Sequence, residues 1–168
     1  MADTATKIPL ASVTLSATTD TVVFGSISQS YTDLILVSSV IGTTTGQDIR
    51  IQINGDTATN YSATWFDSHY NSSPTSGRLT NRSNFQLTNY VGTGTTEPTA
   101  SIVNFFSYSN TTTYKTMVAR HSQIQGTYYE TMILVNLWRS TSAINSISIY
   151  LGGSTFASGS KLNLYGVL

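Results

Sequence analysis

The chain has 168 residues, 10% of them charged, and 8 basic residues balance 8 acidic ones to a formal net charge of +0. A chain of this length predicts one domain with a buried core, and its scattered single charges leave no basic patch to attract nucleic acid or an anionic membrane. Because the sequence contains no cysteine, it excludes disulfides and thiolate metal sites. We therefore expect one domain whose partners include neither nucleic acid nor a membrane.

The composition also indicates the fold class. Ser and Thr are abundant and helix-forming residues are scarce, which suits an all-β protein because Thr favours strands and Ser favours turns. About ten short β-rich runs follow one another, with turn residues between them and without a helical period. The sequence predicts a single-domain antiparallel β-sandwich of the jelly-roll type over residues 8–168.

The first residues of the chain are small and polar, and we expect residues 1–7 to form a flexible arm. They lack the basic segment and continuous apolar core of a signal peptide, so we expect synthesis in a cytoplasm without a leader. The first predicted strand, Ile8–Leu15, contains Pro9, which indicates an edge position or the start of a strand.

The next three runs predict strands with different exposure. Thr21–Ile27 is short, whereas Leu34–Ile41 is almost continuously apolar and predicts a strand with both faces covered. Asp48–Asn54 alternates, which places its three isoleucines inward and its long polar side chains outward. Asn54-Gly55 then predicts a tight turn.

The oxygen-rich segment Asn54–Asn60 allows two interpretations. Its Asn and Asp side chains can hold a hard cation such as Ca²⁺, or they can stabilise a turn. Because the segment lacks the acidic density of a calcium loop, we favour the turn.

Aromatic residues gather in the following run. Tyr61–Phe66 predicts a strand, and the polar stretch Asp67–Asn84 predicts a long loop of the kind that carries interaction sites. Flat rings beside Asn and Asp can stack on sugars, but the same residue types are enriched in cores and subunit interfaces. We favour core and interface packing over a glycan site for the candidate contact residues, which are Tyr61, Trp65, His69 and Tyr70.

The second half of the chain continues with strands. The remaining predicted strands are Phe85–Val91, Ile102–Tyr108, Tyr114–Ile124, Met132–Trp138, Ile144–Leu151 and Leu162–Leu168. We expect a turn at Tyr128-Tyr129 and an antiparallel meander of the last three runs. In this meander Trp138 belongs to the core, Leu162, Leu164 and Leu168 share one face, and the last run is a paired strand.

The sequence shows no constellation typical of catalysis. Asp56 and Asp67 can meet across a hairpin as paired carboxylates, but we favour two solvated loop residues. His69 and His121 lack the spacing that brings two imidazoles to one metal ion, and we expect each at the surface or at an interface. Nucleophile-elbow and phosphate-binding motifs are absent. We therefore predict no catalytic, cofactor-binding or metal-binding residue and no enzymatic activity.

Several segments from Ile53 to Leu168 form a series that carries a family resemblance. They are Ile53–Thr57, Asn60–Ser62, Tyr108–Thr116, Leu137–Ile147, Phe156–Ser160 and Leu164–Leu168. In this order they resemble a group of small virion proteins of tailed bacteriophages that end in a GSxxxLYG strand. The resemblance implies a structural component of the virion, and it does not assign a binding residue.

Two functions within a virion follow from this resemblance. In the first, the chain is a capsid decoration or cement protein that binds the outer shell as a homotrimer, with the major capsid protein or other virion proteins as partners. An N-terminal arm that includes Ala2, Asp3, Lys7 and Ile8 would contact the shell, together with one sheet edge. In the second, the chain is a tail-fibre or receptor-binding module whose aromatic residues bind a host glycan. We favour the first function, and we expect no cofactor.

Overall fold

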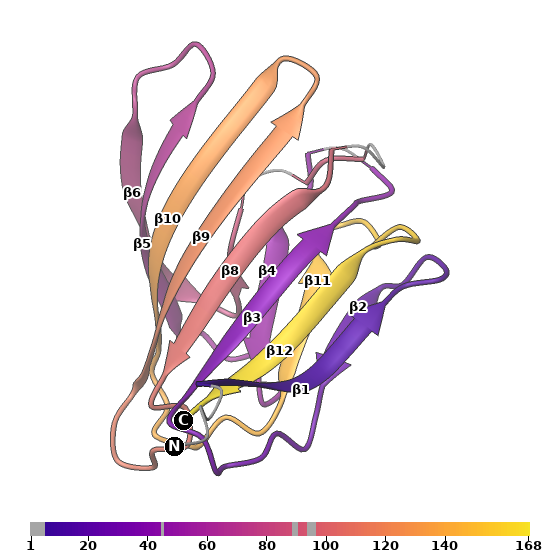
Figure 1. The fold of residues 1–168 in the computed structure, drawn as a ribbon. Helices are drawn as coiled ribbons and strands as arrows, with labels where there is room; N and C mark the ends of the chain where they lie inside the picture. The colour runs from indigo at the N-terminus through magenta and orange to yellow at the C-terminus, as the bar shows by residue number, and fades with distance from the viewer. Residues whose placement is uncertain (1–5, 45, 89–90, 94–96) are drawn as a thin grey trace.

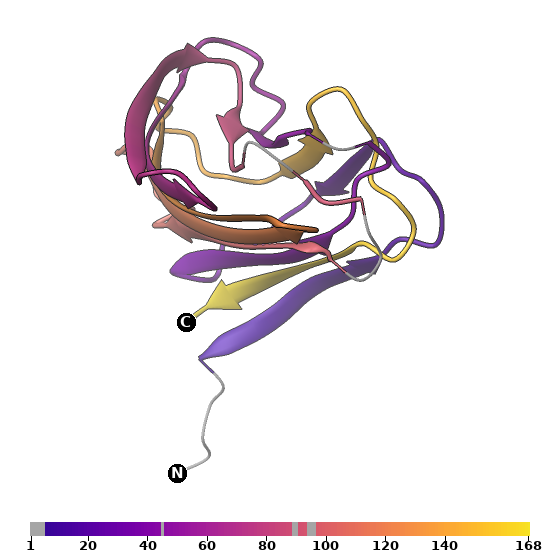
Figure 2. The same cartoon turned by 90° about the horizontal axis from the view of Figure 1, so that it is seen from above.

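The computed structural model describes residues 6–44, 46–88, 91–93 and 97–168. These residues form twelve β-strands and no helix, so the described part of the chain contains no helix able to span a membrane. The strands pair in antiparallel fashion in two sheets, which pack face to face (Figure 1, Figure 2). The prediction of an all-β antiparallel sandwich is confirmed.

Among the described residues, one sheet has eight strands and the other has four. In spatial order, the large sheet contains β1 (Lys7–Thr14), β12 (Lys161–Val167), β3 (Asp33–Val40), β8 (Thr99–Phe106), β9 (Lys115–Gln125), β10 (Tyr128–Trp138), β5 (Tyr61–His69) and β6 (Thr75–Arg82). The small sheet contains β2 (Thr21–Phe24), β11 (Ile147–Leu151), β4 (Ile49–Ile53) and β7 (Phe85–Gln86). The unequal sheets do not specify a jelly roll, and that finer assignment stays a prediction.

The core lies between the two sheets because each strand buries alternate residues. The three isoleucines of β4 are buried while its two polar residues are partly exposed, as the alternation predicted. Trp138 is also buried, as expected. The large sheet contributes Leu34, Leu36, Val103, Phe105, Leu162 and Leu164 to this core. Burial of each such side chain stabilises the fold by about 1.5–3 kcal/mol.

The edge position that Pro9 indicated is confirmed, because β1 is an outermost strand of the large sheet. The strand has a register shift between Pro9 and Ala11, where the proline has no N–H to donate. β1 begins at Lys7, which pairs with Val167, so the predicted arm over residues 1–7 is too long. Lys7 and Ile8 belong to the sheet, and the other two arm residues, Ala2 and Asp3, lie outside the described residues.

The strand predicted at Leu34–Ile41 is β3, and its two faces differ. Its even-numbered residues are buried against the small sheet, whereas Ile35, Val37 and Ser39 on the other face are half-buried. The prediction that both faces are covered is therefore wrong. Among the described residues, no layer lies above the apolar side chains on the outer face of the large sheet.

The meander predicted for the last three runs is also wrong. β10 pairs with β9 and β5, β11 pairs with β2 and β4, and β12 pairs with β1 and β3. The chain therefore crosses from the large sheet to the small sheet and back, because alternation determines which residues are buried but not which strand is the neighbour. Leu162 and Leu164 are buried as predicted, while Leu168 lies beyond β12 and is exposed. β12 itself is paired, as expected.

The predicted loop Asp67–Asn84 is instead a β-hairpin. β5 continues to His69, and β6 returns alongside it after a turn in which Asn71 has a φ of 62°. β6 is an edge strand and is mostly exposed on both faces, so its residues are polar although they are paired. Polar composition here reflects exposure to water and not the absence of a strand.

The turn between β9 and β10 lies earlier in the chain than predicted. Gly126 has a φ of 58° in this turn, a conformation that glycine adopts without steric cost. Tyr128 and Tyr129, which were expected in the turn, are the first residues of β10. Successive strand residues point to opposite faces, so the two tyrosines serve different sides of the sheet.

Candidate functional site

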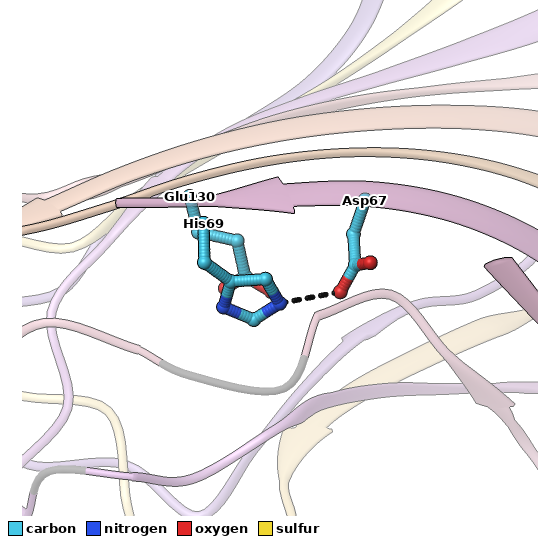
Figure 3. Close-up of side chains that lie close together, drawn as sticks. All are labelled: Asp67, His69 and Glu130. Carbon is cyan, nitrogen blue, oxygen red and sulfur yellow. Dashed lines mark hydrogen bonds and ion pairs between the residues drawn. The ribbon is translucent and has the colours of Figure 1, made fainter. Parts of the chain in front are cut away.

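A group of ionisable side chains lies on the inner face of the large sheet. Asp67 and His69 are alternate residues of β5 and point to the same side, and Glu130 of β10 is the cross-strand partner of His69. The register therefore brings the three side chains together, as Figure 3 shows. They lie near the turns of the β5–β6 and β9–β10 hairpins, and Figure 1 shows these hairpins extending past the strands of the small sheet.

His121 joins this group from β9. Its Nε2 lies 3.4 Å from Oε2 of Glu130, and both side chains are fully buried. The prediction of a surface or interface histidine is therefore wrong for His121, because the odd-numbered residues of β9 face the core. Asp67, His69, Glu130 and His121 are called the inner cluster below.

His69 occupies the middle of the inner cluster. Its Nε2 lies 2.6 Å from Oδ2 of Asp67 and 3.9 Å from Oε1 of Glu130. Its Nδ1 is hydrogen-bonded to the hydroxyl of Tyr128, and the hydroxyl of Thr75 on β6 donates to Oδ1 of Asp67. Side chains from β5, β6, β9 and β10 thus meet at this point.

The carboxylates of the inner cluster are buried without a basic lysine or arginine beside them. The side chains of Asp67 and Glu130 are 2% and 0% exposed, and among the described residues their ion-pair partners are histidines alone. In the same part of the chain, neither Glu130 oxygen and neither ring nitrogen of His121 makes a hydrogen bond. Removing carboxylates from water costs several kcal/mol per ion unless a cation or hydrogen-bond donors replace the water. In the cluster two buried carboxylates therefore face two imidazoles, and the polar atoms of Glu130 and His121 lack hydrogen-bond partners among the described residues.

The inner cluster has the donor types of a metal site. One oxygen of Asp67, one nitrogen of His69 and one oxygen of Glu130 lie within 4.8 Å of one another. Imidazole and carboxylate together can bind a divalent metal ion, and they can also share protons. Sequence reasoning missed this arrangement because it ended the strand before Asp67. An Asp-x-His pattern inside a strand, which places both side chains on one face, is the signal that could have found it.

The four candidate contact residues from the sequence do not share one surface. Tyr61 is fully buried, Trp65 is half-buried against the core, and His69 belongs to the inner cluster. Tyr70 is 53% exposed and packs against Tyr129, with their ring centroids 5.5 Å apart. A glycan cannot reach Tyr61, so these residues do not form a single sugar site.

The segment Asn54–Asn60 forms the turn that we favoured. Its first two residues have φ angles of 53° and 67°, and the Asp56 carboxylate accepts hydrogen bonds from the Ala58 N–H, the Asn60 amide and the Trp138 indole. Burial raises the pKa of Asp56, but these donated hydrogen bonds outweigh burial and lower the pKa below its ordinary value. The carboxylate therefore serves the turn itself.

The two aspartates that were considered as a catalytic pair do not meet. Asp56 precedes β5 and is held by Trp138, whereas Asp67 lies near the other end of β5 and is held by His69 and Thr75. The prediction of a solvated loop residue is wrong for Asp67, because its side chain faces the interior of the sandwich.

The outer face of the large sheet carries exposed apolar side chains. Ile133 and Val135 of β10 point away from the small sheet, and Phe66 lies opposite Ile133 on β5. Tyr129 lies opposite Ile124 on β9 in the same way. The outer patch, as it is called below, comprises Phe66, Tyr70, Ile124, Tyr129, Ile133 and Val135, each about half exposed. A shallow hollow of about 300 Å³ over β3, β8, β9 and β10 lies beside it.

Comparisons with known proteins do not place the chain in a family. No family model, curated protein or solved structure matches it. The resemblance to virion proteins of tailed bacteriophages therefore stays a prediction, and the outer patch and the inner cluster are the features that bear on function.

Proposed function

We propose that this chain is a non-enzymatic structural subunit of an assembled particle. The outer patch carries the proposal, because large apolar side chains on three neighbouring strands remain exposed in the single chain. Exposed large apolar side chains gathered on one face of a sheet favour protein–protein contact. Packing of the patch against another copy of the chain, in a homotrimer, would remove these side chains from water at about 25 cal/mol per Å² of apolar area.

We assign the particle to the virion of a tailed bacteriophage, where the chain acts as a decoration or cement protein on the capsid shell. The resemblance of the segments between Ile53 and Leu168 supports this assignment. The major capsid protein is the proposed partner. The contact to it is the edge strand β1, which presents unpaired backbone groups along one side, together with the residues that precede it.

A second candidate function is host recognition from the tail, as a tail-fibre or receptor-binding module. The observation that favours it is the exposed pair Tyr70 and Tyr129, whose rings lie edge to face. Exposed aromatic faces of this kind can stack on the apolar side of a sugar. In this function the glycan contacts these two tyrosines and does not reach Tyr61.

Substitutions in the outer patch test the assembly role. Val135→Asp places a charge in the patch, and we expect the purified chain to stay folded but to lose its trimer in analytical ultracentrifugation. Val23→Asp is the matched control, because Val23 and Val135 are 58% and 53% exposed and Val23 lies on the small sheet. A Val135→Asp variant that still forms the same oligomer as the parent would contradict the proposal.

The number of copies per virion distinguishes the two locations. Quantitative mass spectrometry of purified particles compares this chain with the major capsid protein. Similar amounts of the two proteins indicate shell decoration, and a small multiple of three indicates the tail. Absence of the chain from purified particles would reject both virion assignments.

A further inference from the structure

The inner cluster has a chemistry that the assembly role does not use. We propose that Asp67, His69 and Glu130 bind one divalent transition-metal ion, and that His121 positions Glu130 for this purpose. This site is independent of the outer patch, since it lies on the opposite face of the large sheet. A test of metal binding can therefore fail or succeed independently of a test of the proposed assembly.

The three donor atoms lie close to the spacing of metal ligands. Nε2 of His69 faces Oδ2 of Asp67 at 2.6 Å and Oε1 of Glu130 at 3.9 Å. Ligands bound at about 2.0–2.2 Å in a tetrahedral site lie about 3.4 Å from one another. Side-chain rotations that open the first contact and close the second would bring the donors to this spacing.

The burial of Glu130 also indicates a missing partner for its carboxylate. Glu130 is fully buried, and in the described part of the chain both of its oxygens lack a hydrogen bond. Natural proteins rarely leave a buried carboxylate in this state, because buried charges are paired or coordinate metals. A divalent cation between Glu130 and Asp67 would neutralise both carboxylates at once.

The surrounding side chains supply the outer contacts that metal sites need. Metal-bound histidines use their second ring nitrogen for a hydrogen bond, and the hydroxyl of Tyr128 takes this place at Nδ1 of His69. Metal-bound carboxylates are also held by their second oxygen. Thr75 holds Oδ1 of Asp67, and His121 lies 3.4 Å from Oε2 of Glu130. His69 and Asp67 therefore each have one atom for the metal and another bonded to a protein partner, while Oε2 of Glu130 faces His121.

The donor set indicates the class of ion. One imidazole and two carboxylates suit first-row ions such as Zn²⁺, Mn²⁺, Fe²⁺ and Co²⁺. Ca²⁺ and Mg²⁺ prefer oxygen ligands alone, so the histidine disfavours both. The side chain of His69 is 22% exposed while those of the other members are buried, which suits a closed structural site reached from the His69 side.

Metal binding would fasten together the two hairpins that extend past the small sheet. The ligands lie on β5 and β10, and their supporting residues lie on β6 and β9. An ion at this point would stabilise the folded state by mass action, because the unfolded chain does not hold the ligands together.

In the first experiment, the full chain is treated with EDTA to remove bound metal, and the EDTA is then removed by gel filtration. We expect isothermal titration calorimetry to show one Zn²⁺ per chain, and Zn²⁺ to raise the midpoint of thermal unfolding. Ca²⁺ and Mg²⁺ at the same concentration should leave the midpoint unchanged. No binding of Zn²⁺, Mn²⁺ or Co²⁺ by the folded wild-type chain would overturn the proposal, and this result does not depend on any variant.

Variants then locate the ion. Glu130→Gln and His69→Gln should each abolish Zn²⁺ binding, with circular dichroism to verify the fold, while Glu97→Gln, at the other glutamate of the chain, should bind as the parent does. His121→Asn should keep the stoichiometry but weaken binding about 10- to 100-fold, the loss typical of residues that support a ligand. It should also shift the visible absorption of bound Co²⁺, which a purely structural effect leaves unchanged. Binding that survives in both Glu130→Gln and His69→Gln would place the ion elsewhere and refute the site.

Discussion

The indole ring of Trp65 lies over the backbone of Gly77, its cross-strand partner on β6. A Cβ atom built on Gly77 would come within 2.7 Å of Cε2 of Trp65, which is closer than real Cβ atoms approach a neighbour. The ring thus fills the space that a side chain would occupy and covers an edge strand of the large sheet, as aromatic residues do for edge glycines in other sheets.

Gly77→Ala should therefore destabilise the fold. We expect a loss of about 1–3 kcal/mol in the free energy of unfolding, because the methyl group forces the indole ring or β6 to move. Urea unfolding followed by tryptophan fluorescence measures this loss. Gly25→Ala is the control, since a Cβ there meets nothing within 4 Å, and it should change stability by less than about 0.5 kcal/mol. Equal losses of stability in the two variants would show that the position of the Trp65 ring does not require a glycine at residue 77.

The contact between Asp56 and Trp138 gives a second prediction. Nε1 of Trp138 donates to Oδ2 of Asp56 at 2.7 Å, and Asp56→Ala leaves this buried indole N–H without its partner. We expect a loss of about 1–3 kcal/mol and a shift of the tryptophan emission. Asp56→Asn should lose less, because an amide oxygen still accepts the hydrogen bond.

The pKa of Asp56 also predicts part of the acid sensitivity of the fold. Since the folded-state pKa is lowered, the ionised carboxylate stabilises the fold above its ordinary pKa of about 3.9, and this contribution is lost as the pH falls through the folded value. Urea unfolding of Asp56→Asn at a series of acidic pH values should show a weaker pH dependence than the parent. The same slope in both proteins would contradict the prediction.

Buried tyrosines predict the behaviour at alkaline pH. Burial raises the pKa of Tyr61, Tyr108 and Tyr150. Above about pH 10, the ordinary pKa of tyrosine, the unfolded chain loses protons that the folded chain keeps, so the free energy of unfolding should fall as the pH rises. Unfolding and the absorbance of tyrosinate should change together in an alkaline titration.

Tyr61→Phe separates this effect from a general loss of stability. The Tyr61 hydroxyl accepts from the Ile53 N–H at 3.1 Å and donates to the Asp56 carbonyl at 2.9 Å, so the variant should lose about 1–3 kcal/mol at neutral pH. Its stability should then fall less steeply than that of the parent above about pH 10. An equal or steeper fall would mean that burial does not raise the pKa of Tyr61 in the folded state.

Substitution of Asn54 distinguishes the contribution of its side-chain hydrogen bonds to stability from that of its backbone conformation. Its Oδ1 accepts from the N–H groups of Asn145 and Ser146, and its Nδ2 donates to the Ala143 carbonyl, which ties the turn to the connection before β11. Asn54→Gly suits the φ of 53° but removes these bonds, and we expect a loss of about 1–3 kcal/mol in urea unfolding. The control is Asn71→Gly, at an exposed residue with a φ of 62°, which should be nearly neutral. A neutral Asn54→Gly would show that only the backbone conformation matters.

The sequence predicted those parts of the fold that depend on local pattern. The alternation in Asp48–Asn54 predicted which side chains of that strand are buried, and Pro9 predicted an edge strand. Both predictions depend only on the residues of the strand itself. The neighbours of β10, β11 and β12 were not predictable in this way. An alternating run fits either sheet equally well, and only packing of the whole chain decides between them.

Most of the candidate site could not be predicted from the sequence, because it too depends on how the strands pair. His121 and Glu130 lie on different strands, and only the β9–β10 register brings their side chains together. Polar residues around Asp67 suggested a loop because an exposed edge strand and a loop have similar composition. The glycine of the closing segment shows the same dependence on tertiary structure, since Gly166 lies beneath Tyr31, whose Cγ would be 2.5 Å from a Cβ there.

The position of β12 between β1 and β3 determines when the chain can finish folding. Both of these strands are synthesised early, yet neither can complete its native pairing before residues 161–167 leave the ribosome. Until then, one side of each strand offers unpaired backbone groups to any other chain nearby. Pairing between such distant segments is intrinsically slow, so nascent chains should depend on chaperones, and a premature stop before β12 should yield aggregates instead of a smaller folded protein.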